Sequence, residues 1–350
     1  MTSSAQSGNA DAVIRPRGAH LVGSVPLADN EAVFREVAAK LGTHLRRMPD
    51  GETGIRTNWI QWQFPLLTQV PEFEPVNEQP GPFGPRLQLR SGVASEDIAF
   101  PELGYQAAAI ESYTVFARLQ DAGVIGEGIR FQVCLPTPLA VIHLRFIPHD
   151  QETVEQAYER QLLAELDGML EAIPAETLAI QWDTAVEFAV LEGILDSFLA
   201  EPEPDILERL ARLGNHVPTD AELGYHLCYG DAGHQHFVEP ADTAKLVAVA
   251  NGVSERVDRP IDWLHMPVPR GRSDEAYFAP LRDLRLHPET ESYLGLVHMT
   301  DGVEGANARI AAAQTVVTDF GVATECGFGR RPAETIPDLL EVHSGVADPR

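Results

Sequence analysis

Residues 150–184 have the sequence DQETVEQAYERQLLAELDGMLEAIPAETLAIQWDT, and this stretch decides the fold. In residues 150–173 the apolar side chains recur at a spacing near 3.6, which predicts a long amphipathic helix. Residues 178–184 form a short apolar run that ends in Asp183 and Thr184, which is typical of a buried parallel strand. The stretch therefore predicts a helix that leads into a strand of a parallel sheet.

The same unit recurs along the chain. Helical patterns also cover residues 30–42, which open with Asn30 as a candidate cap and close on Gly42, and residues 304–321. Eight alternating units predict a single α/β domain folded as a (β/α)8 TIM barrel. The alternative, a doubly wound open sheet, would want a glycine-rich phosphate loop after its first strand, and GSVPLAD at residues 23–29 is not one. The eight candidate strands are residues 19–26, 44–52, 129–138, 178–184, 223–231, 261–269, 293–302 and 321–329.

One segment interrupts this rhythm. Residues 53–105 are rich in proline, glycine and aromatic residues and are too long for an ordinary loop. We expect an insertion after the second strand, at the top of the barrel, that serves as a substrate lid or as a structural flap. Its Trp59, Trp62 and Phe64 would either cap an apolar substrate or fix the segment to the barrel. The barrel domain itself is predicted to span residues 19–345, after a disordered tail at residues 1–18.

Composition limits the partners and the compartment. The chain has 350 residues, a formal net charge of -26 and 3 cysteines. Such acidity argues against nucleic acid and anionic membranes as partners. Three cysteines far apart in sequence form no disulfide framework, which indicates a reducing compartment. The first residues show no signal-peptide pattern, and no apolar run approaches the ~20 residues of a spanning helix. We therefore expect a soluble, cytoplasmic protein.

Metal-binding residue types lie at predicted strand ends, where active sites of this fold are found. His226 and Cys228 are two residues apart, so both side chains can face the barrel axis. Alone, such a pair is more often a histidine beside a buried cysteine that acts as a small hydrophobe. Cys326 at the end of the last strand makes a tetrahedral zinc site the favoured interpretation. Cys134 is not accompanied by other candidate ligands, and we expect it in the core.

Thiolate ligands suit one kind of zinc chemistry. They donate charge, so zinc that carries them activates water poorly but binds and deprotonates a substrate thiol. His265 and His298 lie at the ends of the sixth and seventh predicted strands, where they would face the same mouth.

The motifs, taken in order, resemble those of the catalytic barrel of cobalamin-independent methionine synthase. The wider group includes epoxyalkane:coenzyme M transferase and uroporphyrinogen decarboxylase-like barrels. The resemblance runs from about residue 20 to residue 331, and its most specific part is the HxC pair with the late Cys-Gly. The motifs are GSVP, DGETGIRTNW, IQWDTAVE, YHLCYGD, RSDEAY, LVHMTDG and ECGFGRR.

The resemblance implies a role for each matching residue. His226, Cys228 and Cys326 match zinc ligands. Glu52 and Asp183 match the carboxylates that hold the amino group of homocysteine. The remaining matches are Gly23 and Ser24 with the loop that holds the homocysteine carboxylate, and His298 with a histidine that moves a proton during methyl transfer. Arg56 follows Glu52 closely in the sequence, and we expect it to pair with the Glu52 carboxylate or with an anionic group of the substrate.

The chain also departs from the synthase pattern. Where the synthase has a glutamate as fourth zinc ligand, this chain has His265, which is a substitute ligand, a core histidine, or a sign that only three protein ligands exist. The synthase has a second, N-terminal barrel that helps to bind folate, whereas we expect a single barrel here, which puts methyltetrahydrofolate in doubt as the donor. His234 and His236 form an HxH pair that either contacts substrate or belongs to a solvated loop.

Three functions are compatible with these features. The first is a zinc-dependent thiol methyl- or alkyltransferase that acts on a small thiol, similar to homocysteine or coenzyme M, through a zinc-bound thiolate, with a small-molecule alkyl donor. The second is a lyase or decarboxylase of the porphyrinogen type, which would need arginines for substrate carboxylates. The candidates, Arg46 and Arg47 on the second strand and Arg15 and Arg17 in the tail, fit poorly. The third is a non-catalytic partner barrel.

Overall fold

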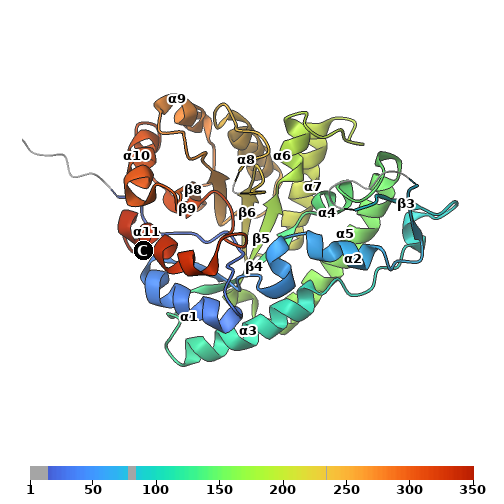
Figure 1. Ribbon diagram of the computed structural model, residues 1–350, viewed down its shortest axis with the longest axis horizontal. Coiled ribbons are helices and arrows are strands. Elements are labelled where there is room, and N and C mark those ends of the chain that lie inside the picture. The colour runs from blue at the N-terminus through green and yellow to red at the C-terminus, as the bar shows by residue number, and fades with distance from the viewer. Residues whose placement is uncertain (1–14, 78–83, 234) are drawn as a thin grey trace, which may run out of the picture.

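A curled parallel sheet forms the centre of the protein, and helices surround it (Figure 1). The computed structural model describes residues 15–77, 84–233 and 235–350. The seven strands follow one another in the order β1-β4-β5-β6-β7-β8-β9, and every neighbouring pair is parallel. Their bounds are β1 Arg47–Pro49, β4 Arg130–Pro136, β5 Leu178–Thr184, β6 Glu222–Leu227, β7 Trp263–Pro267, β8 Glu291–Val297 and β9 Gly321–Thr324.

The helices form the outer layer. The pairs α1–α11, α1–α3, α3–α5, α7–α8 and α10–α11 are in contact, so the first and last helices meet. None of the described helices is long and apolar enough to span a membrane. Their bounds are α1 Asn30–Leu41, α2 Phe64–Leu67, α3 Tyr105–Asp121, α4 Pro138–His143, α5 Pro148–Ala172, α6 Val186–Leu191, α7 Pro202–His216, α8 Ala244–Arg256, α9 Glu275–Phe278, α10 Gly302–Gln314 and α11 Ile336–Val346.

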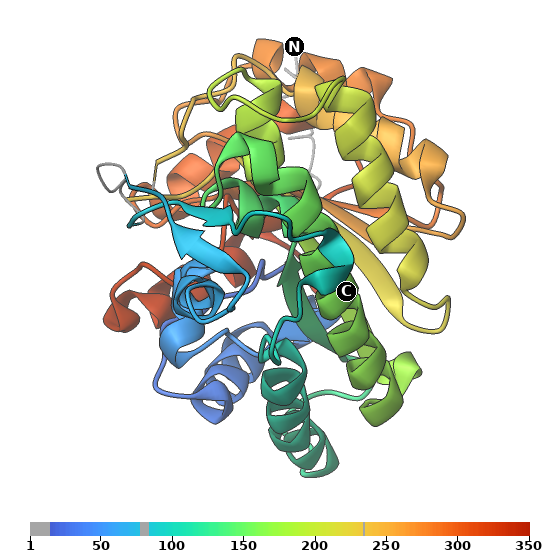
Figure 2. The same ribbon diagram turned by 90° about the vertical axis from the view of Figure 1, so that its right-hand side faces the viewer.

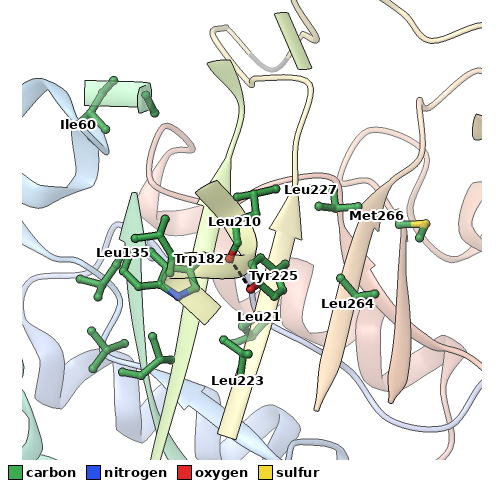
Figure 3. Packing of buried hydrophobic residues seen from close by; sticks show 14 of the residues in the cluster. Leu21, Ile60, Leu135, Trp182, Leu210, Leu223, Tyr225, Leu227, Leu264 and Met266 are labelled. Atoms are coloured by element: carbon green, nitrogen blue, oxygen red, sulfur yellow. Dashed lines mark hydrogen bonds between the residues drawn. The ribbon is translucent and has the colours of Figure 1, made fainter. Parts of the chain in front are cut away.

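Alternation along the strands separates two buried layers. Trp182, Tyr225 and Leu264 belong to the main apolar core between sheet and helices, where the Tyr225 hydroxyl donates to the carbonyl of Leu210 in α7 (Figure 3). On each strand the residues next to these point to the opposite side of the sheet. Ala179, Trp263, Tyr293 and Ala323 form a separate apolar cluster on that side. Because the side-chain period of a strand is two, Gln181, Asp183, His226 and His265 share the side of that inner cluster.

The predicted closed barrel of eight strands is wrong in one element. Residues 19–26 form no strand; between β9 and β1 the chain makes only a single bridge, from Ala19 to Val322, and the Ala19 amide donates to the carbonyl of His44. The carbonyls of Leu21 and Val22 accept instead from the side-chain amides of Gln132 in β4 and Gln181 in β5. The sheet is therefore a curled half-barrel of seven strands, consistent with a TIM-like barrel but not closed.

The segment that follows β1 has structure of its own. Strands β2 Phe73–Pro75 and β3 Leu87–Leu89 pair antiparallel, and β3 docks through the Leu87 amide on the carbonyl of Arg145, just before α5. Figure 2 shows this light-blue and cyan segment lying across α5 in green. Trp62 packs edge-on against Tyr105 and the Arg145 guanidinium lies over the Phe64 ring, so these two aromatic residues fix the segment to the body of the protein.

Several predicted boundaries agree with the structure. The predicted strand 178–184 coincides with β5, and α5 begins two residues before the predicted helix. Helix α1 is capped by Asp29, whose carboxylate accepts from the Ala32 amide at 2.8 Å, and not by Asn30. Of the predicted tail, residues 1–14 lie outside the described residues, whereas Arg17 bridges to Asp348 beside the C-terminus.

Candidate active site and metal centre

A cavity of about 420 Å³ opens at the carboxyl ends of the strands. Its inner end is lined by the residues predicted to bind metal and the polar end of a substrate: Gly23, Ser24, Glu52, Asp183, His226, Cys228 and Cys326. A wider surface hollow of about 700 Å³ over α7 and α8 shares no residue with this cavity. The structure therefore brings together, in one cavity, residues that are more than 300 positions apart in the chain.

His226, Cys228 and Cys326 converge at one point. One ligand atom from each lies within 4.8 Å of the others, and the two sulfurs are 3.8 Å apart. Both cysteines are free thiols, since a disulfide would bring the sulfurs to about 2.05 Å. The Gly230 amide donates to the Cys228 sulfur at 3.2 Å.

This donor set fits zinc. Two zinc–sulfur bonds of about 2.3 Å at a tetrahedral angle place the sulfurs about 3.8 Å apart, which matches the separation of the two cysteine sulfurs. The His226 Nε2 atom is buried and has no hydrogen-bond partner, as expected of a nitrogen kept for a metal. Burial, together with the nearby charges of His265 and His20, lowers the pKa of His226 well below its usual value, so the ring is neutral and able to ligate.

His265, predicted as a tentative fourth ligand, lies directly opposite His226 on the next strand. Its Nδ1 is 2.7 Å from Nδ1 of His226, and its Nε2 is 2.9 Å from the carbonyl oxygen of Thr324. Both nitrogens of His265 thus have protein partners, and the ring is not part of the three-residue cluster.

Glu52 and Asp183 form a buried carboxylate pair that makes no direct ion pair among the described residues, although the more distant charges of Arg56 and Arg330 act to lower the pKa of Glu52. Burial raises the pKa of both carboxyls well above their usual values, and repulsion from Asp183 and Asp50 raises that of Glu52 further. The Gln181 side-chain amide donates to Asp183 at 2.9 Å and partly offsets its shift. An ammonium group in the cavity would supply the missing positive charge.

Arg56 acts on Glu52 through its charge but forms its ion pair with Asp50. Its guanidinium contacts Asp50 at 2.7 Å, and it is not among the residues that line the cavity. Asp50 also accepts from the Glu52 amide at 2.8 Å and from the Ser112 hydroxyl at 2.9 Å. Asp50 and Arg56 therefore hold the loop that carries Glu52, in which Glu52 itself adopts a left-handed backbone with φ of 44°.

Gly23 and Ser24 fit closely against the other elements of the site. A Cβ on Gly23 would lie 2.9 Å from Oε2 of Glu52 and 3.2 Å from the Cys134 sulfur. The Ser24 hydroxyl accepts from the Gly329 amide at 3.2 Å, which ties this loop to the one that carries Cys326. Cys134 is buried, and burial raises its thiol pKa well above the usual value, so it is the inert core cysteine that the sequence predicted.

His298, predicted to move a proton, is buried away from the cavity. Its Nδ1 is 2.5 Å from the Glu325 carboxylate and its Nε2 is 2.9 Å from the carbonyl of Val268. It does not line the cavity, so its contacts give no support to the predicted role. Burial alone would raise the pKa of Glu325, but the hydrogen bond and charge of His298 outweigh it and lower that pKa.

His236 lines the cavity, as His226 does. Its side chain is only 4% exposed, its Nδ1 is 3.3 Å from the Glu239 carboxylate, and its Nε2 has no hydrogen-bond partner. It is therefore not the solvated loop residue that was one of the two interpretations of the HxH pair; His234 lies outside the described residues. The HxH pattern had pointed to His236 from sequence, with substrate contact as one of its two interpretations.

Many of the other lining residues are apolar. Trp59 and Ile60 come from the segment after β1, and further apolar side chains come from helix α6 and from the loop after β6. The one arginine among the described lining residues, Arg330, donates to the Asp231 carbonyl at 2.8 Å and lies 3.6 Å from its carboxylate. The other apolar lining residues include Leu144, Val186, Ala189, Ile194, Leu195 and Phe237.

Three solved structures share the fold over almost the whole chain. A B12-independent methionine synthase from Shewanella sp. W3-18-1, in complex with selenomethionine, has a TM-score of 0.61 at 14% identity and covers 94% of this chain and 96% of its own. A proposed vitamin-B12-independent methionine synthase from Listeria monocytogenes has a TM-score of 0.55 at 16% identity, with 95% and 97% covered. A methyltransferase from Methanosarcina mazei has 0.54 at 12%, with 95% and 94% covered.

At these identities the likeness shows the fold alone. No protein-family model and no curated protein matches the chain. What this chain does must therefore be argued from its own cavity.

Proposed function

We propose that the protein is a zinc-dependent transferase that moves a methyl or alkyl group to the sulfur of a small thiol. One observation carries the proposal. His226, Cys228 and Cys326 converge on one point at the inner end of a cavity that also holds Glu52 and Asp183. A nitrogen and two sulfurs suit zinc, and a buried carboxylate pair suits an ammonium group.

The three cluster residues would hold the zinc. When bound, zinc lowers the pKa of a thiol that joins it while leaving the sulfur nucleophilic. The protein supplies the neutral Nε2 of His226 and two thiolates, one of which accepts the Gly230 amide. In the absence of a cation, the contact with Cys228 raises the thiol pKa of Cys326 well above its usual value, so loading with zinc must release protons.

The carboxylates favour an amino-acid thiol of the homocysteine type. Glu52 and Asp183 would bind its ammonium group, with Gly23 and Ser24 beside them. A sulfonate thiol such as coenzyme M would want a free cation instead, and Arg330, the arginine found among the described lining residues, is held by Asp231. The Shewanella neighbour is a complex with an amino acid that carries an alkylated selenium, which agrees in chemical class.

The transfer step forms a sulfur–carbon bond and breaks the bond from the alkyl carbon to the leaving group. The leaving group keeps that electron pair and takes up a proton. We assign the proton to His236, since this residue lines the cavity, its Nε2 has no hydrogen-bond partner, and its Nδ1 lies 3.3 Å from the Glu239 carboxylate. The apolar side chains that line the cavity favour an alkyl donor that is itself largely apolar.

The decarboxylase alternative is less well supported. Arg47 is buried between Glu222 and Glu291, Arg46 pairs with Glu291, and Arg15 lies against Asp348. None of these arginines lines the cavity, so they are not placed to hold substrate carboxylates.

Metal analysis tests the proposal. Protein purified without chelator should contain about one zinc per chain, and Cys326→Ser should lose most of it. Cys134→Ser is the matched control, because it also removes one buried thiol but leaves the cluster intact. A wild-type zinc content far below one equivalent, or a content unchanged by Cys326→Ser, would rule out the proposed site.

A further inference from the structure

Two histidines on neighbouring strands form a hydrogen-bonded chain beside the cluster. The chain runs from the Thr324 carbonyl to Nε2 of His265 at 2.9 Å, and from Nδ1 of His265 to Nδ1 of His226 at 2.7 Å. Both rings are almost fully buried. The hydrogen-bonded series ends at His226 Nε2, which has no hydrogen-bond partner. The His226 ring is also the one that lies close to Cys228 and Cys326.

The chain fixes every proton in it. A carbonyl oxygen can only accept, so Nε2 of His265 must carry its proton. In the neutral ring Nδ1 of His265 is then a bare acceptor, and the proton between the two Nδ1 atoms belongs to His226. His226 is therefore left with a bare lone pair on Nε2, the form that a metal requires.

We propose that His265 is a positioning residue and not a fourth zinc ligand: it accepts the Nδ1 proton of His226 and so presents Nε2 of His226 to the metal. To ligate, His265 would have to give up its contact with Thr324 or its contact with His226, because each nitrogen already has a partner. This inference rests on the proposed zinc site and deepens it. Its consequence is a centre with three protein ligands, so the fourth position of a tetrahedral ion is left for the substrate sulfur.

Two substitutions at His265 separate a positioning role from a ligand role. His265→Asn keeps an acceptor near the place of Nδ1, whereas His265→Leu fills the buried space without one. Zinc affinity is measured by competition with a chromophoric chelator. We expect His265→Leu to weaken zinc binding by about 10- to 100-fold, the usual effect of losing an outer-shell partner, and His265→Asn to stay within a few-fold of wild type. Equal affinity in all three proteins would overturn the inference.

X-ray absorption at the zinc edge of the unmodified protein gives a test that needs no variant to fold. We expect one imidazole and two sulfurs from the protein; two imidazoles would show that His265 is a ligand. Failure of the two proposals is distinguishable. If wild type binds no zinc, the proposed function fails, whereas tight binding through two imidazoles overturns only the positioning role of His265.

Discussion

Gly23→Ala tests how closely the substrate end of the cavity is built. The added Cβ would lie 2.9 Å from Oε2 of Glu52 and 3.2 Å from the Cys134 sulfur, both closer than ordinary van der Waals contact. Overpacking of this kind costs about 1–3 kcal/mol, and the lower entropy of the unfolded alanine chain returns about 0.4–1 kcal/mol. We therefore expect the free energy of unfolding to fall by about 0.5–2 kcal/mol.

The clash is also expected to weaken substrate binding. Relief requires the Glu52 carboxylate to move, so its contact with an ammonium group suffers. A loss of about 1.4 kcal/mol in binding free energy corresponds to a tenfold larger dissociation constant for homocysteine. Urea unfolding and calorimetric titration of the zinc-loaded protein measure the two effects.

Gly42→Ala is the control for Gly23→Ala. Gly42 has an ordinary helical φ of -47°, and no atom lies within 4 Å of its added Cβ, so we expect unchanged binding and equal or slightly higher stability. If Gly23→Ala behaves like Gly42→Ala in both assays, the carboxylate does not lie where the cavity geometry requires it.

Other substitutions separate the roles of the cavity residues and of one distant histidine. Glu52→Gln removes one of two repelling carboxylates, so thermal stability should rise while homocysteine binding weakens at least tenfold, as expected for a lost charged hydrogen bond of about 1.5–3 kcal/mol; unchanged binding would contradict the ammonium site. His236→Gln should lower the transfer rate about 100-fold or more without changing zinc content, whereas a comparable rate loss in His298→Gln alone would return the proton transfer to that residue. His343 is fully buried, which lowers its pKa from 6.5 to about 4, so its stabilising contribution is complete above pH 6.5 and is lost as the pH falls. The zinc-free protein should therefore lose about 2 kcal/mol at this site between pH 7 and pH 5, and urea unfolding of His343→Phe at both values should show a correspondingly smaller loss.

Much of the site could be predicted because strand geometry relates spacing to direction. His226 and Cys228 were expected on one side of a strand, and a strand-end position for Cys326 placed it at the same mouth. The period of two is local, so it survives without knowledge of the tertiary structure.

The failures have physical causes that the chain does not display locally. Residues 19–26 have the composition of a strand, but the carbonyls of Leu21 and Val22 are taken by amide side chains of Gln132 and Gln181. The contact of His298 with Glu325 joins the loops after β8 and β9, and that of Arg56 with Asp50 depends on the irregular fold of a single loop, so no spacing rule predicts either pair. Gln181 itself had a signal, since it is a polar residue two positions before Asp183 in an otherwise apolar strand.

The proposed centre is an open zinc site that receives a thiol. X-ray absorption at the zinc edge, with and without homocysteine, tests it most directly. We predict two protein sulfurs and one imidazole in the free protein, and an additional zinc–sulfur bond when homocysteine is added. A centre whose sulfur count does not change on addition of the thiol would contradict it.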